Sequence, residues 1–227
     1  MRIGVIGAGR IGANAGRLAA RAGHMVMFSF ARSTESLDRA AAGAGDRAST
    51  GTPAEAVDFG ELVIFAVPWT AVDEALRQAG SLAGKVVIDT TNQFGPRGLE
   101  QPPDGLSAAA FNARRMPGAG YVKSLNTLTA GFQAEAADRP ESDRAAMFLG
   151  GEDADAKQAA SSLIAEMGFV PVDVGGFGEI WIIEAPRRDG AVYGEEYRPD
   201  DARRIAAAVR DDPEGASELA RTLRVPG

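Results

Sequence analysis

Four glycines near the start of the chain have the spacing of a loop that holds phosphate groups. Gly7, Gly9 and Gly12 form the pattern G-x-G-x-x-G, and Gly16 follows four residues later. Glycine at the first position permits a tight turn, and glycine at the second lets backbone N–H groups approach a pyrophosphate, because no side chain stands in the way. The last two glycines let a helix lie close on a sheet. The pattern therefore predicts a site for the pyrophosphate of a dinucleotide.

The residues around these glycines predict the strands and the helix that such a site needs. Residues 2–6 are an apolar run typical of a buried strand, and apolar residues recur at helical spacing over residues 11–22, until Gly23 ends the helix. A second apolar run follows at residues 25–28. We therefore predict a βαβ dinucleotide-binding unit, with the phosphates at the positive end of the helix. An ordinary glycine-rich turn is the alternative.

The end of the second predicted strand indicates which dinucleotide is bound. An NAD site usually places an acid here to bind the ribose 2′-hydroxyl, but residues 29–33 read Ser-Phe-Ala-Arg-Ser, with no acid before Glu35. Arg32 offers a planar cationic fork to a 2′-phosphate, and Ser29 and Ser33 offer hydroxyls, which favours NADP(H). Alternatively, Arg32 is a solvated loop arginine and Ser33 caps the next helix.

Few side chains offer the proton that a carbonyl or alcohol dehydrogenase needs. The single histidine, His24, lies between a helix end and a strand start, which is a structural position. Tyr121 and Lys123 are the other candidates, but they share one side of a predicted strand, where a surface or salt-bridged role also fits. Hydride exchange between two conjugated rings demands less, because stacking and dipoles position the rings. We assign no catalytic residue, and this shortage favours transfer between two cofactors.

The composition allows one sizeable core and excludes several classes of partner. The chain has 227 residues, 45% of them hydrophobic, and a net charge of −7 that argues against nucleic acid or anionic membranes. It has no cysteine, so disulfides, thiolate catalysis and cysteine metal sites are excluded, and we predict no metal. No apolar run has the length of a membrane span or a secretory leader, so we expect a soluble, cytoplasmic protein.

Strands and helices alternate to about Val174, which predicts an α/β fold with a doubly wound, mostly parallel sheet, the Rossmann fold. We interpret residues 43–51 as connection and residues 93–105 as a long irregular loop. We assign residues 1–175 to the dinucleotide-binding domain and 176–227 to a C-terminal extension. Further strands are predicted at residues 62–67, 86–89, 121–125, 147–149 and 169–174, and further helices at 34–42, 52–58, 72–79, 107–116, 129–136, 154–167 and 201–209.

Three other segments, together with the glycine motif, carry a resemblance to a known family. Residues 66–69 read Ala-Val-Pro-Trp, residues 124–130 read Ser-Leu-Asn-Thr-Leu-Thr-Ala, and residues 150–153 read Gly-Gly-Glu-Asp. Over residues 1–175 the chain resembles the NADP oxidoreductase, coenzyme F-420-dependent family. The resemblance implies hydride transfer between NADPH and the deazaflavin coenzyme F-420.

The resemblance also implies where the cofactors lie. It places NADP on Gly9, Arg10, Ile11, Ser29, Arg32, Val67 and Pro68, and the deazaflavin near Asn92 and Asn126. With Gly7, Gly12, Ser33 and Ala66, these are the predicted cofactor-binding residues.

The chain departs from the family pattern in two places. The serine that usually precedes the family's arginine is Ala31 here, and residues 176–227 do not resemble the C-terminal helix with which archaeal members help to close the deazaflavin site. The apolar run at residues 180–183 and the tyrosines after it form a dimer contact or a lid, or else a plain surface loop. We expect a homodimer.

Two other functions stay open from the residues alone. One is an NADPH-dependent reductase of a small carbonyl, imine, flavin or ferric chelate. The other is a non-catalytic NADP(H) sensor that binds a protein partner.

Overall fold

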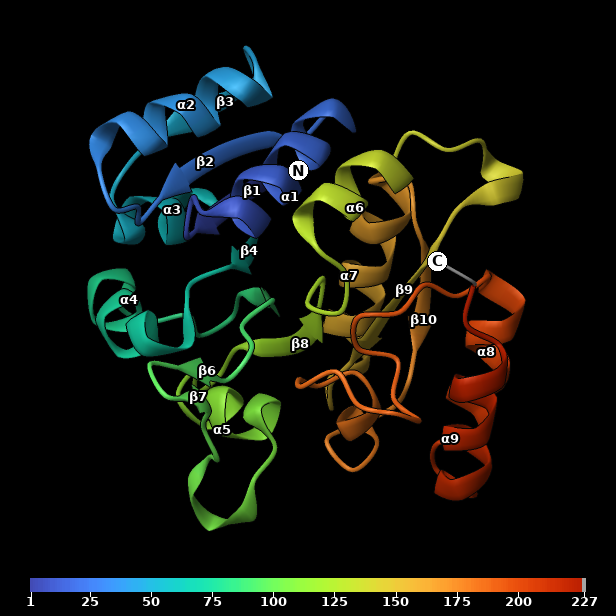
Figure 1. Cartoon of the computed structure of the whole chain (residues 1–227). Helices are drawn as coiled ribbons and strands as arrows, with labels where there is room; N and C mark the ends of the chain where they lie inside the picture. The colour runs from blue at the N-terminus through green and yellow to red at the C-terminus, as the bar shows by residue number, and fades with distance from the viewer. Residues whose placement is uncertain (226–227) are drawn as a thin grey trace.

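One sheet of eight strands organises the computed structural model, which describes residues 1–225 (Figure 1). The strand order is β10-β9-β8-β5-β4-β1-β2-β3, and all neighbours are parallel except β8 and β9. The predicted doubly wound, mostly parallel sheet is therefore confirmed. The strands are β1 (Arg2–Ile6), β2 (Met25–Ser29), β3 (Ala48–Thr50), β4 (Leu62–Phe65), β5 (Val86–Asp89), β8 (Gly120–Ser124), β9 (Ala146–Gly150) and β10 (Val170–Asp173).

The strand β4, near the middle of the sheet, is apolar throughout because helices cover both faces of the sheet. Successive residues of a strand point to opposite faces, so Val63 and Phe65 of β4 enter one apolar cluster, while Leu62 and Ile64 enter the other. The helices α1 (Arg10–Arg21), α2 (Thr34–Ala44), α6 (Ala130–Ala136) and α7 (Ala154–Glu166) supply the second cluster. The helices α3 (Pro53–Phe59), α4 (Val72–Ala79), α5 (Ala108–Arg114), α8 (Pro199–Ala208) and α9 (Pro213–Thr222) supply the first.

Side chains that accept a hydrogen bond from the first turn fix the starts of several helices. Thr52 and Glu55 form a reciprocal capping box at α3, as expected from the Thr-Pro-Ala-Glu sequence. Ser107, Thr129 and Asp153 accept from backbone N–H groups at the starts of α5, α6 and α7. These local signals explain why the predicted helices after residue 50 begin within one or two residues of the observed ones.

Several regular elements were not predicted. The segment 43–51, interpreted as connection, contains the short edge strand β3. The loop at 93–105 contains a hairpin of β6 (Phe94–Gly95) and β7 (Gly98–Leu99), followed by a 3-10 turn, η2 (Pro103–Gly105). The helix α9 begins at Pro213, directly after its N-cap Asp212, so its start signal was present in the sequence.

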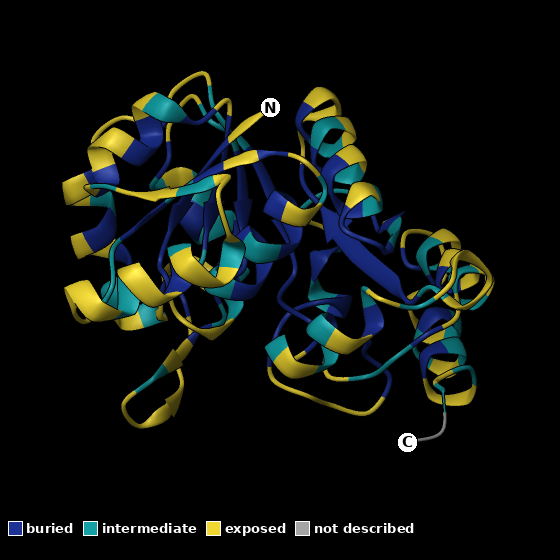
Figure 2. Ribbon diagram, turned by 90° about the horizontal axis from the view of Figure 1, so that it is seen from above, coloured by how far each residue is buried: buried dark blue, intermediate teal, exposed yellow. Residues whose placement is uncertain are grey.

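The residues after 175 pack on the sheet and add to its core. Ile180, Ile182 and Ile183, in and after the 3-10 turn η4 (Ile180–Ile182), are buried in the same cluster as β4 and β5, and α8 packs on β10 and β9. Buried segments lie inside the molecule and exposed residues on the outer sides of the helices (Figure 2). The domain boundary at residue 175 stays a prediction. Within residues 1–225, no helix is both long and apolar enough to cross a membrane.

Candidate functional site

The glycine-rich loop lies at the carboxyl edge of the sheet, where the strand order changes direction. β2 and β3 lie on one side of β1, and β4, β5 and β8 lie on the other. Open α/β sheets bind ligands in the crevice at such a switch point. The loop from Gly7 to Gly9 joins β1 to α1 there. The candidate site is therefore built from this loop and from the carboxyl ends of the neighbouring strands.

Backbone contacts around the loop require glycine at three positions. Gly7 has a φ of +109°, and a Cβ there would stand 2.4 Å from the carbonyl oxygen of Ala66. A Cβ on Gly12 would stand 1.9 Å from the carbonyl oxygen of Gly7, and one on Gly16 would stand 2.4 Å from the Phe28 ring. These glycines let α1 pack closely on β1 and β2, as the sequence predicts.

Gly9 differs because the space beside it is open. Among the described residues no heavy atom lies within 4 Å of where its Cβ would stand. Gly9 is also the N-cap of α1, where no side chain caps the helix and the first turn contains no acid. The first N–H groups of a helix have no acceptor within the helix, so those of Arg10 and Ile11 are available to an anion. An open backbone at an uncapped helix end fits a pyrophosphate.

The end of β2 presents two of its three predicted residues to solvent. Arg32 is exposed and makes no ion pair or hydrogen bond within the part of the chain that the structure describes. Ser33 is exposed at the N-cap of α2 but makes no capping hydrogen bond, and its Oγ lies 3.3 Å from Ser36 Oγ. Ser29 is buried, and its Oγ donates to the carbonyl oxygen of Val5 at 3.0 Å. The expectation that Ser29 offers a hydroxyl to a 2′-phosphate does not hold, because the sheet uses this hydroxyl.

The residues after β4 lie next to the glycine-rich loop. The Ala66 backbone packs against Gly7, Val67 is buried, and Pro68 is exposed. Trp69 then begins a 3-10 turn, η1 (Trp69–Ala71), and its Nε1 donates to Glu100 Oε2 at 2.8 Å. Ala66 and Val67 therefore lie beside the phosphate loop, while the role of Pro68 stays a prediction.

Asn92 and Asn126 lie together although 34 residues separate them in the chain. Asn92 Nδ2 donates to the carbonyl oxygen of Asn126 at 3.1 Å, and Asn126 Nδ2 donates to Asn92 Oδ1 at 3.2 Å. They meet because they follow β5 and β8, which are neighbours in the sheet. The two asparagines form one polar pair at the carboxyl edge.

Residues 183–194 of the C-terminal extension, here called the covering segment, lie over this pair. Three hydrogen bonds attach the segment to Asn92, Gln93 and Asn126: Asn126 Nδ2 donates to Ile183 O at 2.8 Å, Gln93 Nε2 donates to Ala185 O at 3.2 Å, and Asn92 Nδ2 donates to the Tyr193 hydroxyl at 3.3 Å. The role of the segment as a lid or a dimer contact stays a prediction.

Three buried oxygen atoms in this region have no hydrogen-bond partner among residues 1–225. They are Thr91 Oγ1, Gln93 Oε1 and Asn126 Oδ1. Buried polar atoms are nearly always hydrogen-bonded, so each of these oxygens is suited to accept from a bound molecule or a water. The carboxyl ends of β5 and β8 thus hold unused acceptors at the same edge of the sheet as the phosphate loop.

Sequence patterns did not reveal a buried polar cluster beneath the crevice. The Asp89 carboxylate accepts from Tyr121 Oη at 2.6 Å, from Asn112 Nδ2 at 2.8 Å and from the Thr91 backbone N–H at 2.7 Å. Lys123 Nζ lies 3.8 Å from Asp89 Oδ2 and donates to the Thr91 carbonyl oxygen. The cluster fixes Thr91, the residue before Asn92. The salt-bridged role weighed for Tyr121 and Lys123 fits these contacts.

Neither Tyr121 nor Lys123 presents a proton to the crevice. Tyr121 is 5% exposed and Lys123 is 0% exposed. Burial and the negative charge of Asp89 raise the pKa of the Tyr121 phenol well above its usual value, so the hydroxyl stays protonated and donates to Asp89. His24 is remote from the crevice in its contacts, with Nδ1 3.3 Å from the N-terminal amine and Nε2 2.8 Å from Glu166 Oε2.

Comparison with protein families identifies the N-terminal part of the chain. Residues 2–93 match a family described as NADP oxidoreductase, coenzyme F-420-dependent. These residues run from β1 to the loop after β5 and include the phosphate loop, Arg32 and Asn92. The resemblance predicted from the sequence is confirmed for this part of the chain.

Solved structures confirm the fold over most of the chain. A hypothetical protein of Sinorhizobium meliloti is 25% identical, with a TM-score of 0.76, over 86% of this chain and 94% of that one. A protein of Arthrobacter sp. FB24, provisionally named an F-420-dependent NADP-reductase, is 24% identical, with a TM-score of 0.65, over 77% of this chain and 85% of that one. Because the identity is only 24%, the similarity to the Arthrobacter protein shows the fold alone.

A curated relative matches part of the chain. The metalloreductase STEAP3 of Rattus norvegicus is 29% identical over 132 residues, which are 58% of this chain and 26% of that protein. The chain therefore spans about a quarter of this relative's length.

Proposed function

We propose that the chain moves a hydride between NADPH and the deazaflavin F-420, on the basis that residues 2–93 match the NADP oxidoreductase, coenzyme F-420-dependent family. The observation that carries the proposal is the open backbone at Gly9 beside the uncapped start of α1, with Arg32 unpaired at the next strand end. The asparagine pair and its unused acceptors lie along the same edge of the sheet.

The chain's own residues would bind and orient two ring systems. N–H groups of the first turn of α1 would hold the pyrophosphate, and Arg32 the 2′-phosphate. When bound, NADPH would supply the hydride, that is, two electrons and one proton, and the second proton needed to reduce the deazaflavin would come from solvent. Asn92 and Asn126 would orient the rings, and the covering segment would exclude water from them. No side chain is required to protonate an alkoxide, which agrees with the buried positions of Tyr121 and Lys123.

Arg32→Ala should weaken NADPH binding far more than NADH binding. A charge-assisted contact with the 2′-phosphate contributes about 1.5–3 kcal/mol, which corresponds to a roughly 10- to 150-fold change in Kd for NADPH. NADH lacks this phosphate, so its Kd should hardly change. Titration of both cofactors by fluorescence measures the effect. Arg39→Ala, on the exposed side of α2, is the matched control. Equal losses for both cofactors would show that Arg32 does not select NADP(H).

Transfer to F-420 is tested directly by absorbance. Oxidised F-420 mixed with the protein and NADPH should lose its deazaflavin band at the rate at which NADPH is consumed. The parallel experiment replaces F-420 with a ferric chelate, a free flavin or a small imine. NADPH consumption with one of these acceptors and none with F-420 would overturn the proposed second substrate, while an absence of turnover with every acceptor would favour an NADP(H) sensor.

A ferric chelate is the second candidate acceptor because of the match to the rat metalloreductase. That match covers about a quarter of the relative, so the reductase activity of the whole protein is only a proposal for this chain.

A further inference from the structure

Four arginines gather around one cavity on the C-terminal side of the molecule. Arg187 and Arg188 come from the covering segment, while Arg221 and Arg224 come from the end of α9 and the residues after it. The cavity has a volume of about 290 Å³. It lies apart from the phosphate loop, none of whose residues lines it.

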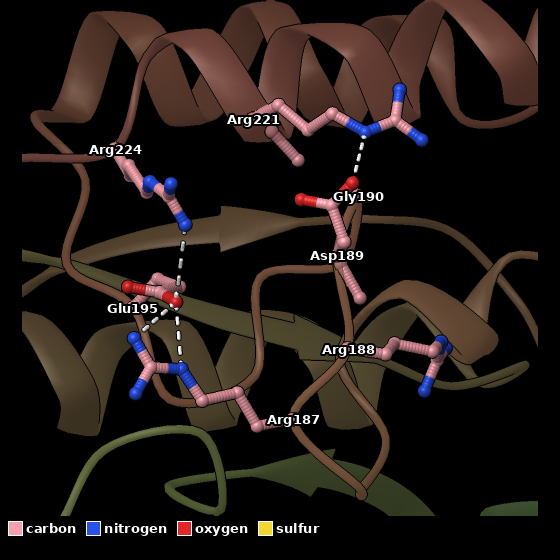
Figure 3. Close-up of a pocket in the computed structure, with 9 residues that line it drawn as sticks. Arg187, Arg188, Asp189, Gly190, Glu195, Arg221 and Arg224 are labelled. Atoms are coloured by element: carbon pink, nitrogen blue, oxygen red, sulfur yellow. Dashed lines mark hydrogen bonds and ion pairs between the residues drawn. The ribbon is translucent and has the colours of Figure 1, made fainter.

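The carboxylates at this cavity do not balance its arginines. Glu195 serves two of them, with Arg187 Nε at 2.8 Å and Arg224 Nη1 at 3.7 Å, and Asp189 accepts from Arg221 Nε at 2.6 Å. Figure 3 shows these two groups on opposite sides of the cavity. Arg221 Nη1 also lies 3.0 Å from Glu218 Oε2, outside the cavity lining. Four arginines against these three carboxylates leave a formal excess of one positive charge, in a chain whose net charge is −7.

Arg188 has no carboxylate within 4 Å among residues 1–225. Its guanidinium donates to the carbonyl oxygens of Glu184, at 2.9 Å, and of Trp181, and it lies 5.9 Å from the centre of the Trp181 ring. Arg188 is an exposed residue, so its guanidinium, which has no direct counterion, is open to an anion from solvent.

We propose that this cavity binds a small oxyanion through these four arginines. Guanidinium groups present planar pairs of N–H donors that match phosphoryl and carboxylate oxygens, and a bound anion would offset the charge excess. Such an anion would join the covering segment to α9. The site is separate from the proposed dinucleotide site and does not depend on it.

Calorimetric titration of the full chain with inorganic phosphate and with succinate tests the site. It also shows whether the site prefers a phosphoryl or a carboxylate ligand. We expect saturable binding of at least one of them, and the tighter one identifies phosphoryl or carboxylate as the preferred group. Arg188→Met and Arg224→Met should each raise Kd about tenfold or more, because each removes charge-assisted hydrogen bonds. Arg203→Met is the matched control, since Arg203 pairs with Asp200 on the exposed side of α8.

The phosphate loop is a competing site for the same probes, and Gly9→Val separates the two. Binding at the arginine cavity should persist in Gly9→Val and weaken in the arginine variants, whose folding is checked by circular dichroism. No saturable binding of either anion would overturn the proposal. Binding that Gly9→Val removes and that both arginine variants retain would also overturn it.

Discussion

Gly9→Val is expected to abolish dinucleotide binding in a protein that remains folded. The backbone at Gly9 is extended, with φ −79° and ψ −166°, so valine is allowed there, and its Cβ would meet no heavy atom of the described residues within 4 Å. The side chain would instead occupy the space that a pyrophosphate needs. Loss of two charge-assisted hydrogen bonds costs roughly 3–6 kcal/mol, or about 10²- to 10⁴-fold in Kd. Fluorescence titration with NADPH measures the loss, and circular dichroism checks the fold.

Two other glycines serve as controls for this substitution. Gly43 of α2 also has no heavy atom near its Cβ position but lies away from the loop, so Gly43→Val should bind NADPH normally. Gly12→Val should lose the fold itself, because a Cβ there would stand 1.9 Å from the Gly7 carbonyl oxygen. A Gly9→Val protein that binds NADPH as tightly as the parent would show that the glycines form only a turn.

The phosphate loop could be predicted from the sequence because its signals are local. The spacing of Gly7, Gly9 and Gly12 predicts where two backbone segments approach each other closely. The apolar runs on both sides predict the strands and the helix that the loop connects. The same holds for the helices that begin at Thr52 and Ser107, where the capping side chain and the helix it caps are consecutive in the chain.

Features that depend on strand order could not be predicted in this way. Ser29 looks available in the sequence, but the pairing of β2 with β1 turns its hydroxyl to Val5. Asp89 meets Tyr121 and Lys123 only because β8, and not β6 or β7, is the neighbour of β5. The covering segment reaches Asn92 across about 100 residues of chain, so its position follows from tertiary packing.

The cluster around Asp89 leads to the second large expected effect. Lys123→Met should lower the free energy of unfolding by about 3–5 kcal/mol, because it leaves the Asp89 carboxylate buried without its cation. Urea denaturation followed by circular dichroism measures this change. Lys157→Met is the matched control: its Nζ lies 2.8 Å from Asp173 Oδ2 in a partly exposed pair, and it should cost about 1 kcal/mol or less.

A double variant separates the charge pair from simple loss of packing. Asp89→Asn carries no charge and keeps Oδ1 for the Thr91 N–H, and the Tyr121 hydroxyl, which now donates to Oδ2, can turn to accept from the new amide group. Lys123→Met with Asp89→Asn should therefore recover part of the stability lost in Lys123→Met alone. If the loss of unfolding free energy in the double variant equals the sum of the losses in the two single variants, the charge pair contributes no coupling energy and Lys123 acts through packing.

The single variant Lys123→Met also distinguishes a positioning role of Lys123 from general acid catalysis. If Lys123 acts only by fixing Thr91 beside Asn92, Lys123→Met protein that is folded and saturated with NADPH should transfer hydride to F-420 less than about tenfold more slowly in a single turnover. Removing a true general acid costs about 10²- to 10⁴-fold. Lys123 Nζ already donates to the Thr91 carbonyl oxygen and faces Asp89, so it has no open path to a substrate oxygen. A loss of 10²-fold or more with F-420, at a temperature where the variant is fully folded, would contradict this reasoning and favour reduction of a carbonyl.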